Sequence, residues 1–189
     1  SGQAVRSAFS EMTVGIKKKR PDAVIDGVVI EPMVSRPHAR EVLLGMTSDP
    51  VLGPVIVFGA GGVDVEAFQD RAVTLPPLNS YLARDLIKRT RVATLLDSFR
   101  NRPAADLDAL ERILLRVSEM VCELPWLEEM DINPLLVDEH GALALDARII
   151  IAPRVPSADR YGHMAIHPYP AHLVTLWQLP NGSDVIIRP

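Results

Sequence analysis

The sequence predicts an α+β fold, on three observations. Short segments rich in valine and isoleucine recur between residues 23 and 75, in the manner of strands. Two stretches with apolar residues at helical spacing follow between residues 79 and 124. Two further strand-like segments then flank the polar turn 138–141, which is the pattern of a hairpin. We therefore expect a sheet with helices packed against it.

The chain opens on a helical pattern. Apolar residues at positions i, i+3, i+4 and i+7 predict a helix over residues 4–12. The basic run 17–22 breaks this pattern and is typical of a solvated loop. Segments 23–34 and 40–46 are rich in β-branched residues and predict two strands, joined by a turn at 35–38.

Two more strands and two helices are predicted next. A third strand over 54–58 runs into the glycine-rich turn 59–62, and a fourth over 71–75 stops at a Pro-Pro pair. Asn79 or Ser80 can cap the first helix. The apolar stripe of the second, longer helix consists of Leu107, Leu110, Leu114, Val117, Val121 and Leu124.

The predicted hairpin decides which polar side chains meet. Side chains alternate along a strand, so Asp131 and Asn133 share one face. A register centred on the turn places Asn133 opposite Asp146 and Asp131 opposite Arg148, with Cβ atoms about 5 Å apart. The apolar face of the hairpin should consist of Met130, Ile132, Pro134, Leu136, Leu143, Leu145, Ala147 and Ile149.

These facing polar residues are a candidate metal site. The amide oxygen of Asn133 and the carboxylate of Asp146, with Asp131 on the same face, suit a hard divalent ion such as Mg²⁺. The alternative is an ordinary ion pair between Asp131 and Arg148 beside a hydrogen bond between Asn133 and Asp146. The spacing alone leaves both interpretations open.

Two acids and a glycine run are candidate ligand contacts. Glu31 ends an apolar segment and could wall a planar pocket, while Glu41 on the next strand could accept hydrogen bonds from sugar hydroxyls. The backbone N–H groups of the turn that contains Gly61 and Gly62 could wrap a phosphate, although the turn lacks the spacing of known phosphate-binding fingerprints. The alternatives are two solvent-facing acids and a plain tight turn.

Composition argues against several classes of partner. The 189 residues carry 24 acidic and 20 basic side chains, interspersed, so no positive field exists to hold nucleic acid or an anionic membrane. No apolar run is long enough to span a bilayer, and no signal-peptide pattern opens the chain. The histidines lack metal-ligand spacing, and no Gly-x-Ser-x-Gly motif occurs. The single cysteine, Cys122, fits a reducing compartment, so we expect a cytoplasmic protein.

The composition changes after residue 153. Prolines come close together there among Ser, Asp, Gly and His, which predicts a linker, and Asn181-Gly182 predicts a hairpin turn in the tail. Because the chain lacks an initial methionine, we expect it to be a piece of a longer protein. We divide it into a domain at 4–152 and a linker with hairpin at 153–189.

Three motifs occur in an order known from one family. They are the segment 27–34 followed by Arg40-Glu41, the segment 49–63 with its Gly59-Ala60-Gly61-Gly62 turn, and Asp131-Ile132-Asn133-Pro134-Leu135 followed by Leu145-Asp146-Ala147-Arg148. Over residues 5–152 the sequence resembles the ATP-grasp domain of NDP-forming acyl-CoA synthetases, relatives of the succinyl-CoA synthetase β chain. This resemblance implies the C-terminal lobe of an ATP-grasp fold, a mostly antiparallel sheet with packed helices.

The resemblance also implies a site for ATP or ADP with Mg²⁺. The nucleotide-binding residues it implies are Glu31 at the adenine hinge, Val34 in the same segment, Glu41 on the ribose, Gly61 and Gly62. The metal ligands it implies are Asn133 and Asp146, with Asp131 as a plausible further partner. These assignments rest on the matching motif positions in this sequence.

In the family, a phosphoryl group passes between the nucleotide and a histidine on another domain, and then to an acyl group that leaves as its CoA thioester. The resemblance implies that an N-terminal lobe, a CoA-binding domain and a phosphohistidine domain are needed as partners, so we expect this partial ATP-grasp domain to be inactive alone. The tail resembles the junction to a GNAT-type acetyltransferase, which implies such a domain after residue 189. The alternative function is a non-catalytic scaffold for that lysine acetyltransferase.

Overall fold

Two compact units make up the protein in the computed structural model. They are Ser1–Ser35 and Arg36–Pro189, and each is described by itself. The structure describes residues 2–62, 70–98, 101–153, 161–166, 175–179 and 184–187.

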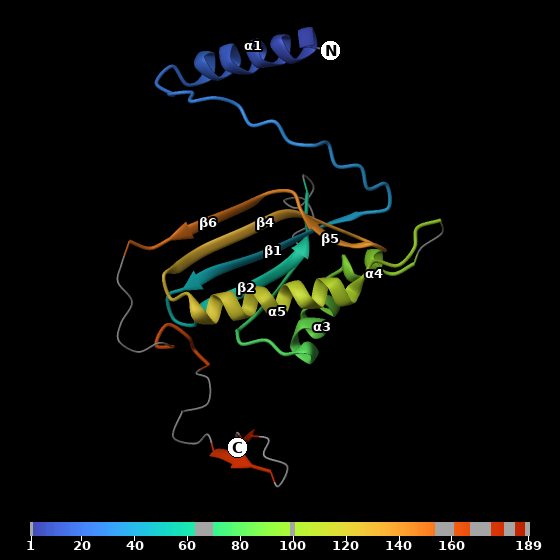
Figure 1. The fold of residues 1–189 in the computed structure, drawn as a ribbon, viewed down its shortest axis with the longest axis vertical. Helices are drawn as coiled ribbons and strands as arrows, with labels where there is room; N and C mark the ends of the chain where they lie inside the picture. The colour runs from blue at the N-terminus through green and yellow to red at the C-terminus, as the bar shows by residue number, and fades with distance from the viewer. Residues whose placement is uncertain are drawn as a thin grey trace. The chain divides into compact units, whose positions relative to one another are not determined.

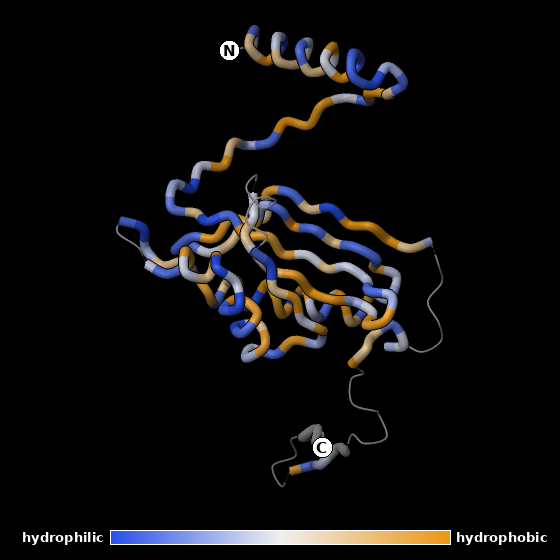
Figure 2. Tube along the Cα trace, turned by 180° about the vertical axis from the view of Figure 1, so that it is seen from behind, coloured by the Kyte–Doolittle hydropathy of each residue, from blue (hydrophilic) through white to orange (hydrophobic). Residues whose placement is uncertain are grey.

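The N-terminal unit contains one helix, α1 (Gly2–Lys19), which is longer than the predicted 4–12. Its last turn carries Lys17, Lys18 and Lys19, where positive charge complements the helix dipole. The predicted strand over 23–34 was wrong, since the structure assigns no strand there. A strand needs a hydrogen-bonded neighbour, and none of the described strands pairs with this segment. Its apolar side chains remain exposed, among them Val29 and Ile30, in the hydrophobic stretch that follows α1 (Figure 2).

The second unit contains a six-stranded antiparallel sheet (Figure 1). Its strands are β1 (Arg40–Asp49), β2 (Gly53–Ala60), β3 (Arg71–Thr74), β4 (Leu127–Asp138), β5 (Gly141–Ala144) and β6 (Ala147–Ile151). The order is β3-β2-β1-β4-β5. Strand β6 also pairs with β4, along the part of β4 that precedes its pairing with β5. The predicted strands over 40–46, 54–58 and 71–75 are therefore confirmed, and so is the predicted antiparallel sheet.

Helices α3 (Ser80–Lys88) and α5 (Leu107–Glu123) begin where the sequence predicted. The side-chain oxygen of Asn79 accepts a hydrogen bond from the Leu82 N–H at 2.9 Å, which satisfies one of the free donors at the start of α3. Asp106 caps α5 in the same way, by accepting from the Ala109 N–H at 2.8 Å. A short helix, α4 (Ala93–Leu96), was not predicted.

One face of the sheet is covered by α3 and α5, as the two opposite views show (Figures 1 and 2). The largest fully buried apolar side chains come from the sheet and from the helices that cover it: Val42, Leu44, Ile56, Phe58, Leu86, Leu96, Leu110, Leu114, Val121, Leu135 and Val137. Cys122 on α5 is free and buried as expected, and desolvation raises the pKa of its thiol. In the described part of this unit, no helix covers the opposite face, which we call the open face.

A β-bulge in β4 changes which residues of the hairpin face the helices. Asn133 and Pro134 stand together opposite Leu43, because the register of β4 against β1 shifts between Val42 and Leu44. The bulge reverses the alternation, so Leu135 and Val137 enter the core after Met130 and Ile132. The prediction that Pro134 and Leu136 continue this apolar face was therefore wrong.

The return strand is interrupted at the matching place. It divides into β5 and β6 around Leu145 and Asp146, and Leu145 is exposed although it was predicted to share the apolar face. Ala142 of β5 and Ala147 of β6 both face α5, so the alternation reverses here as well. Bulge and interruption lie opposite one another.

The tail contains a second, separate ladder. Strands β7 (Thr175–Gln178) and β8 (Asp184–Ile187) pair antiparallel, so the predicted pair of strands is confirmed. The predicted Asn181-Gly182 turn lies outside the described residues. Across the described ranges, no helix combines the length and the hydropathy needed to cross a bilayer.

The turn between β4 and β5 predicts an acid-sensitive contact. The His38 ring donates from Nδ1 to the Glu139 carboxylate at 2.9 Å, and this hydrogen bond lowers the pKa of Glu139 below its ordinary 4.5. A carboxyl group whose pKa is lower in the folded than in the unfolded state stabilises the fold at pH values above its unfolded pKa. This contribution is lost as the pH falls through the folded-state pKa. We expect urea midpoints between about pH 3 and pH 6 to fall more steeply with acidification in the wild type than in Glu139→Gln. Parallel curves for the two proteins would contradict this.

Candidate nucleotide and metal site

The hairpin register places two of the predicted metal ligands next to each other. The Asn133 N–H donates to the carbonyl oxygen of Asp146 at 3.2 Å, and Asp131 pairs with Arg148 in the ladder. The predicted register of the hairpin is thus confirmed, although the strands on either side of this point change face. Bulges re-aim side chains, and this one places Asn133 at the end of the glycine-rich turn.

That turn joins the end of β2 to both β1 and β4. The Gly61 N–H donates to the carbonyl oxygen of Glu41 at 2.9 Å, and the Gly62 N–H donates to Oδ1 of Asn133 at 3.0 Å. Gly62 has φ +80, and a Cβ on it would lie 1.9 Å from Oε2 of Glu41, so a larger residue would strain the backbone and push that carboxylate aside. The three sequence motifs therefore meet at one place, through Glu41, Gly61–Gly62 and Asn133–Asp146.

The ion pair proposed as the alternative is absent from the described residues. Arg148 pairs with Glu129 instead of Asp131, although Asp131 is its direct neighbour in the ladder. A long arginine side chain reaches the diagonal neighbour as easily as the direct one. Within the described part of the chain, neither the Asp131 nor the Asp146 carboxylate forms an ion pair, and the Asp146 side chain is exposed.

The chemistry of this donor set fits Mg²⁺. It offers an amide oxygen from Asn133 and a carboxylate from Asp146, and Mg²⁺ prefers a few such oxygens together with phosphates and water. The amide oxygen keeps a lone pair free beyond the Gly62 hydrogen bond. No cluster of three or more His, Cys, Asp or Glu residues suited to a metal occurs in the described ranges, so a metal held by Asn133 and Asp146 would need phosphates and water to complete its ligands.

A groove of about 200 Å³ lies on the open face beside these residues. We call it the open-face groove; it is lined by Leu43, Gly45, Met46, Thr47, Val57, Arg71, Glu129, Met130 and Asp131. Asp131 is the only predicted site residue among them. Arg71 was not predicted as a site residue. The sequence signal that could have indicated it is the alternation of Arg71 with Val73 on a short strand, which leaves both side chains on the face away from the helices.

Two predicted residues lie in the other unit. Glu31 and Val34 belong to Ser1–Ser35, where both side chains are exposed. Their assignment to the adenine pocket stays a prediction.

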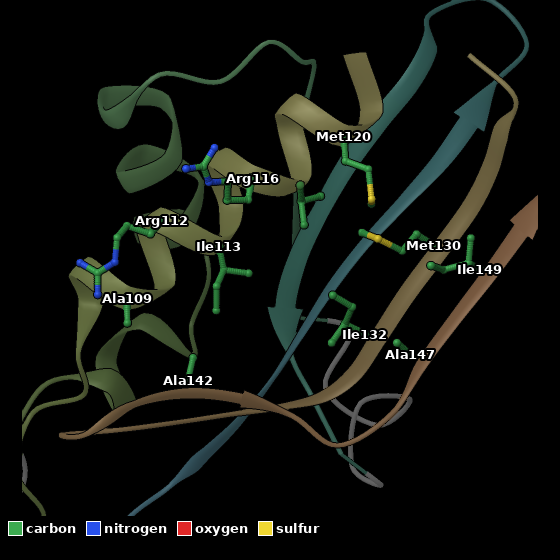
Figure 3. Close-up of a pocket in the computed structure, with 11 residues that line it drawn as sticks. Ala109, Arg112, Ile113, Arg116, Met120, Met130, Ile132, Ala142, Ala147 and Ile149 are labelled. Atoms are coloured by element: carbon green, nitrogen blue, oxygen red, sulfur yellow. The ribbon is translucent and has the colours of Figure 1, made fainter. Parts of the chain in front are cut away.

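The helix-covered face contains a second, apolar groove (Figure 3). It has a volume of about 480 Å³ and lies between one stripe of α5 and the strands β4, β5 and β6. Met120 and Met130 point toward one another across it, while the guanidinium groups of Arg112 and Arg116 point away from the sheet. Without a polar group directed inward, this groove offers no recognisable chemistry for catalysis.

Comparison with known proteins assigns the family. A family model of the ATP-grasp domain matches residues 1–151. The beta subunit of ADP-forming acetate–CoA ligase I from Pyrococcus furiosus is 35% identical over 149 residues, which are 79% of this chain and 63% of that subunit. The beta subunit of ligase II from the same organism is 38% identical over 154 residues, 80% of this chain and 64% of the subunit.

A solved structure of a related synthetase has a similar fold. The dinucleotide-forming acetyl-coenzyme A synthetase 1 of Ca. Korarchaeum cryptofilum, in complex with coenzyme A, Ca-AMPCP and HgCl+, has a TM-score of 0.73 and 34% identity. The alignment covers 80% of this chain and 65% of that chain. The present chain thus spans somewhat less than two thirds of these relatives. Sequence, fold and the convergence of the three motifs together show that the chain belongs to the ATP-grasp domain family, with the ADP-forming acetate–CoA ligases as its relatives.

Proposed function

We propose that this chain is the nucleotide- and magnesium-binding part of an acid–CoA ligase that forms a nucleoside diphosphate. The observation that carries the proposal is the meeting of Glu41, Gly61–Gly62 and Asn133–Asp146 at one place on an ATP-grasp sheet. Relatives named as ADP-forming acetate–CoA ligases support it, and so does the related acetyl-coenzyme A synthetase structure that contains Ca-AMPCP.

Each residue has a task in this proposal. Asn133 and Asp146 hold Mg²⁺, with Asp131 as a further oxygen donor, and the bound ion offsets phosphate charge during phosphoryl transfer. Glu41 accepts hydrogen bonds from the ribose, and the Gly61–Gly62 backbone lies against the phosphates. Glu31 and Val34 complete the adenine pocket.

The whole protein couples formation or breakdown of an acyl-CoA thioester to phosphoryl transfer with ATP or ADP. Its partners are the CoA-binding and phosphohistidine parts, its compartment is the cytoplasm, and the chain alone is inactive in that reaction. The comparisons give no support to the acetyltransferase-scaffold alternative, and the GNAT domain after residue 189 stays a prediction from the tail.

Titration calorimetry tests the proposal, on this chain and on the longer protein that we expect to contain it. We expect ADP to bind with Mg²⁺ and to bind far more weakly with EDTA. Glu41→Ala should weaken MgADP binding by about 10-fold, from the loss of a charged hydrogen bond, but leave 2′,3′-dideoxy-ADP unaffected. Glu128→Ala, an exposed acid on β4, is the matched control. Failure of both wild-type proteins to bind MgADP would overturn the proposal.

A further inference from the structure

Arg71 is an arginine that the site described above does not use. It lies on β3 at the edge of the sheet, lines the open-face groove and is exposed. In the described part of the chain, no ion pair or side-chain hydrogen bond involves it. The other arginine on this face, Arg148, is already paired with Glu129.

The ladder places Arg71 close to the glycine-rich turn. Arg71 pairs with Gly59, and Gly59 pairs with Leu43, so the three form one row across the sheet. Gly59 stands two residues before Gly61, and Leu43 two residues after Glu41. Neighbouring strands are about 4.8 Å apart, so an arginine at this edge reaches inward over the row.

Two glycines lie in the rows of the sheet next to this arginine, at positions where the neighbouring backbone leaves no room for a side chain. A Cβ on Gly59 would lie 2.0 Å from the carbonyl oxygen of Asp70, and one on Gly45 would lie 3.0 Å from that of Met130. The next row across the sheet runs Val73, Val57, Gly45, Asp131. The groove therefore has the Arg71 guanidinium group at its β3 end and the Asp131 carboxylate at its β4 end.

The geometry points to Arg71 as the side chain that binds the transferred phosphoryl group, an inference that rests on the proposed function. A phosphate chain carries more negative charge than one Mg²⁺ neutralises, and a guanidinium donates two parallel hydrogen bonds to phosphate oxygens. Phosphoryl transfer is accelerated by positive charge placed in advance around the moving group. The phosphoryl group belongs either to the nucleotide or to a phosphohistidine, and both present the same oxygens.

Affinity measurements on the longer protein and on this chain test the role. Arg71→Met should weaken binding of the non-hydrolysable analogue MgAMPPCP by about 10- to 100-fold, because a charge-assisted bidentate contact is lost, and leave AMP binding within about 2-fold. Arg71→Lys should recover part of the loss. Arg116→Met, which removes the same charge from an exposed position on α5, should change neither affinity.

The outcomes separate the two proposals. Unchanged MgAMPPCP affinity in Arg71→Met, with tight binding by the wild type, would overturn the role of Arg71 and leave the nucleotide site standing. Absence of any nucleotide binding by the wild type would overturn both.

Nuclear magnetic resonance identifies the source of the phosphoryl group. The Arg71 Nε–H signal, assigned by its loss in Arg71→Lys, should shift with magnesium tripolyphosphate if the nucleotide supplies the group. It should shift with phosphoramidate if a phosphohistidine supplies it. No shift with either probe would overturn the inference.

Discussion

Replacing Asn133 and Asp146 together by alanine is expected to abolish the magnesium dependence of ADP binding. The two residues face each other across the bulge, and they supply the amide and carboxylate oxygens of the proposed metal site. Loss of both ligands should weaken MgADP binding at least about 100-fold. The affinity for ADP in EDTA should equal the weak affinity of the wild type under the same condition. Titration calorimetry with and without Mg²⁺ measures both values.

Matched variants make this result specific to the metal. The double variant Asn101→Ala, Asp85→Ala removes the same two residue types away from the proposed site, from an exposed position and from a half-buried one that pairs with Arg89 at the surface, and it should bind MgADP like the wild type. Asn133→Asp keeps an oxygen that can still accept from the Gly62 N–H, so it should retain much of the affinity. Equal Mg²⁺ dependence in the alanine double variant and the wild type would remove the metal assignment.

Arg40→Met is expected to be the most destabilising single change at the site. Arg40 is 5% exposed, and its guanidinium donates four hydrogen bonds to carbonyl oxygens. The acceptors are Leu95 at 2.7 Å, Pro103 at 2.7 Å, His38 at 3.0 Å and Asp97 at 3.0 Å. Methionine fills similar space without a donor and leaves these carbonyls without that partner, so the free energy of unfolding should fall by about 3 to 5 kcal/mol.

Urea unfolding followed by circular dichroism measures this loss. Arg112→Met is the control, because that arginine is largely exposed and its ion pair with Asp106 spans 3.9 Å, so its loss should cost under about 1 kcal/mol. If Arg40→Met lowered the free energy of unfolding by as little as Arg112→Met, the prediction would be contradicted, because water would then replace the four hydrogen bonds. Since Arg40 precedes Glu41, the variant should also weaken nucleotide binding through the start of β1.

Local signals in the sequence determined most elements of the second unit. Alternation, turn residues and the Asn79 cap are properties of short segments, and they predicted β1 to β3, the two longer helices and the hairpin register that pairs Asn133 with Asp146. The predicted strand over 23–34 was wrong because a strand needs a hydrogen-bonded neighbour, and the composition of a segment does not show whether it has one. The prediction that Leu136 and Leu145 lie on the helix-covered face was wrong because a bulge reverses the alternation of side chains. The residues of a bulge have no distinctive spacing in the sequence.

What the sequence by itself determined is the set of residues on each strand, and through their motifs the family. Only the tertiary structure decided which of them meet. Gly62 reaches Asn133 across 71 positions of chain, and Arg71 shares a groove with Asp131 through the pairing of four strands. Such neighbours depend on strand order and on the bulge, which are long-range properties of the folded sheet that no short segment encodes.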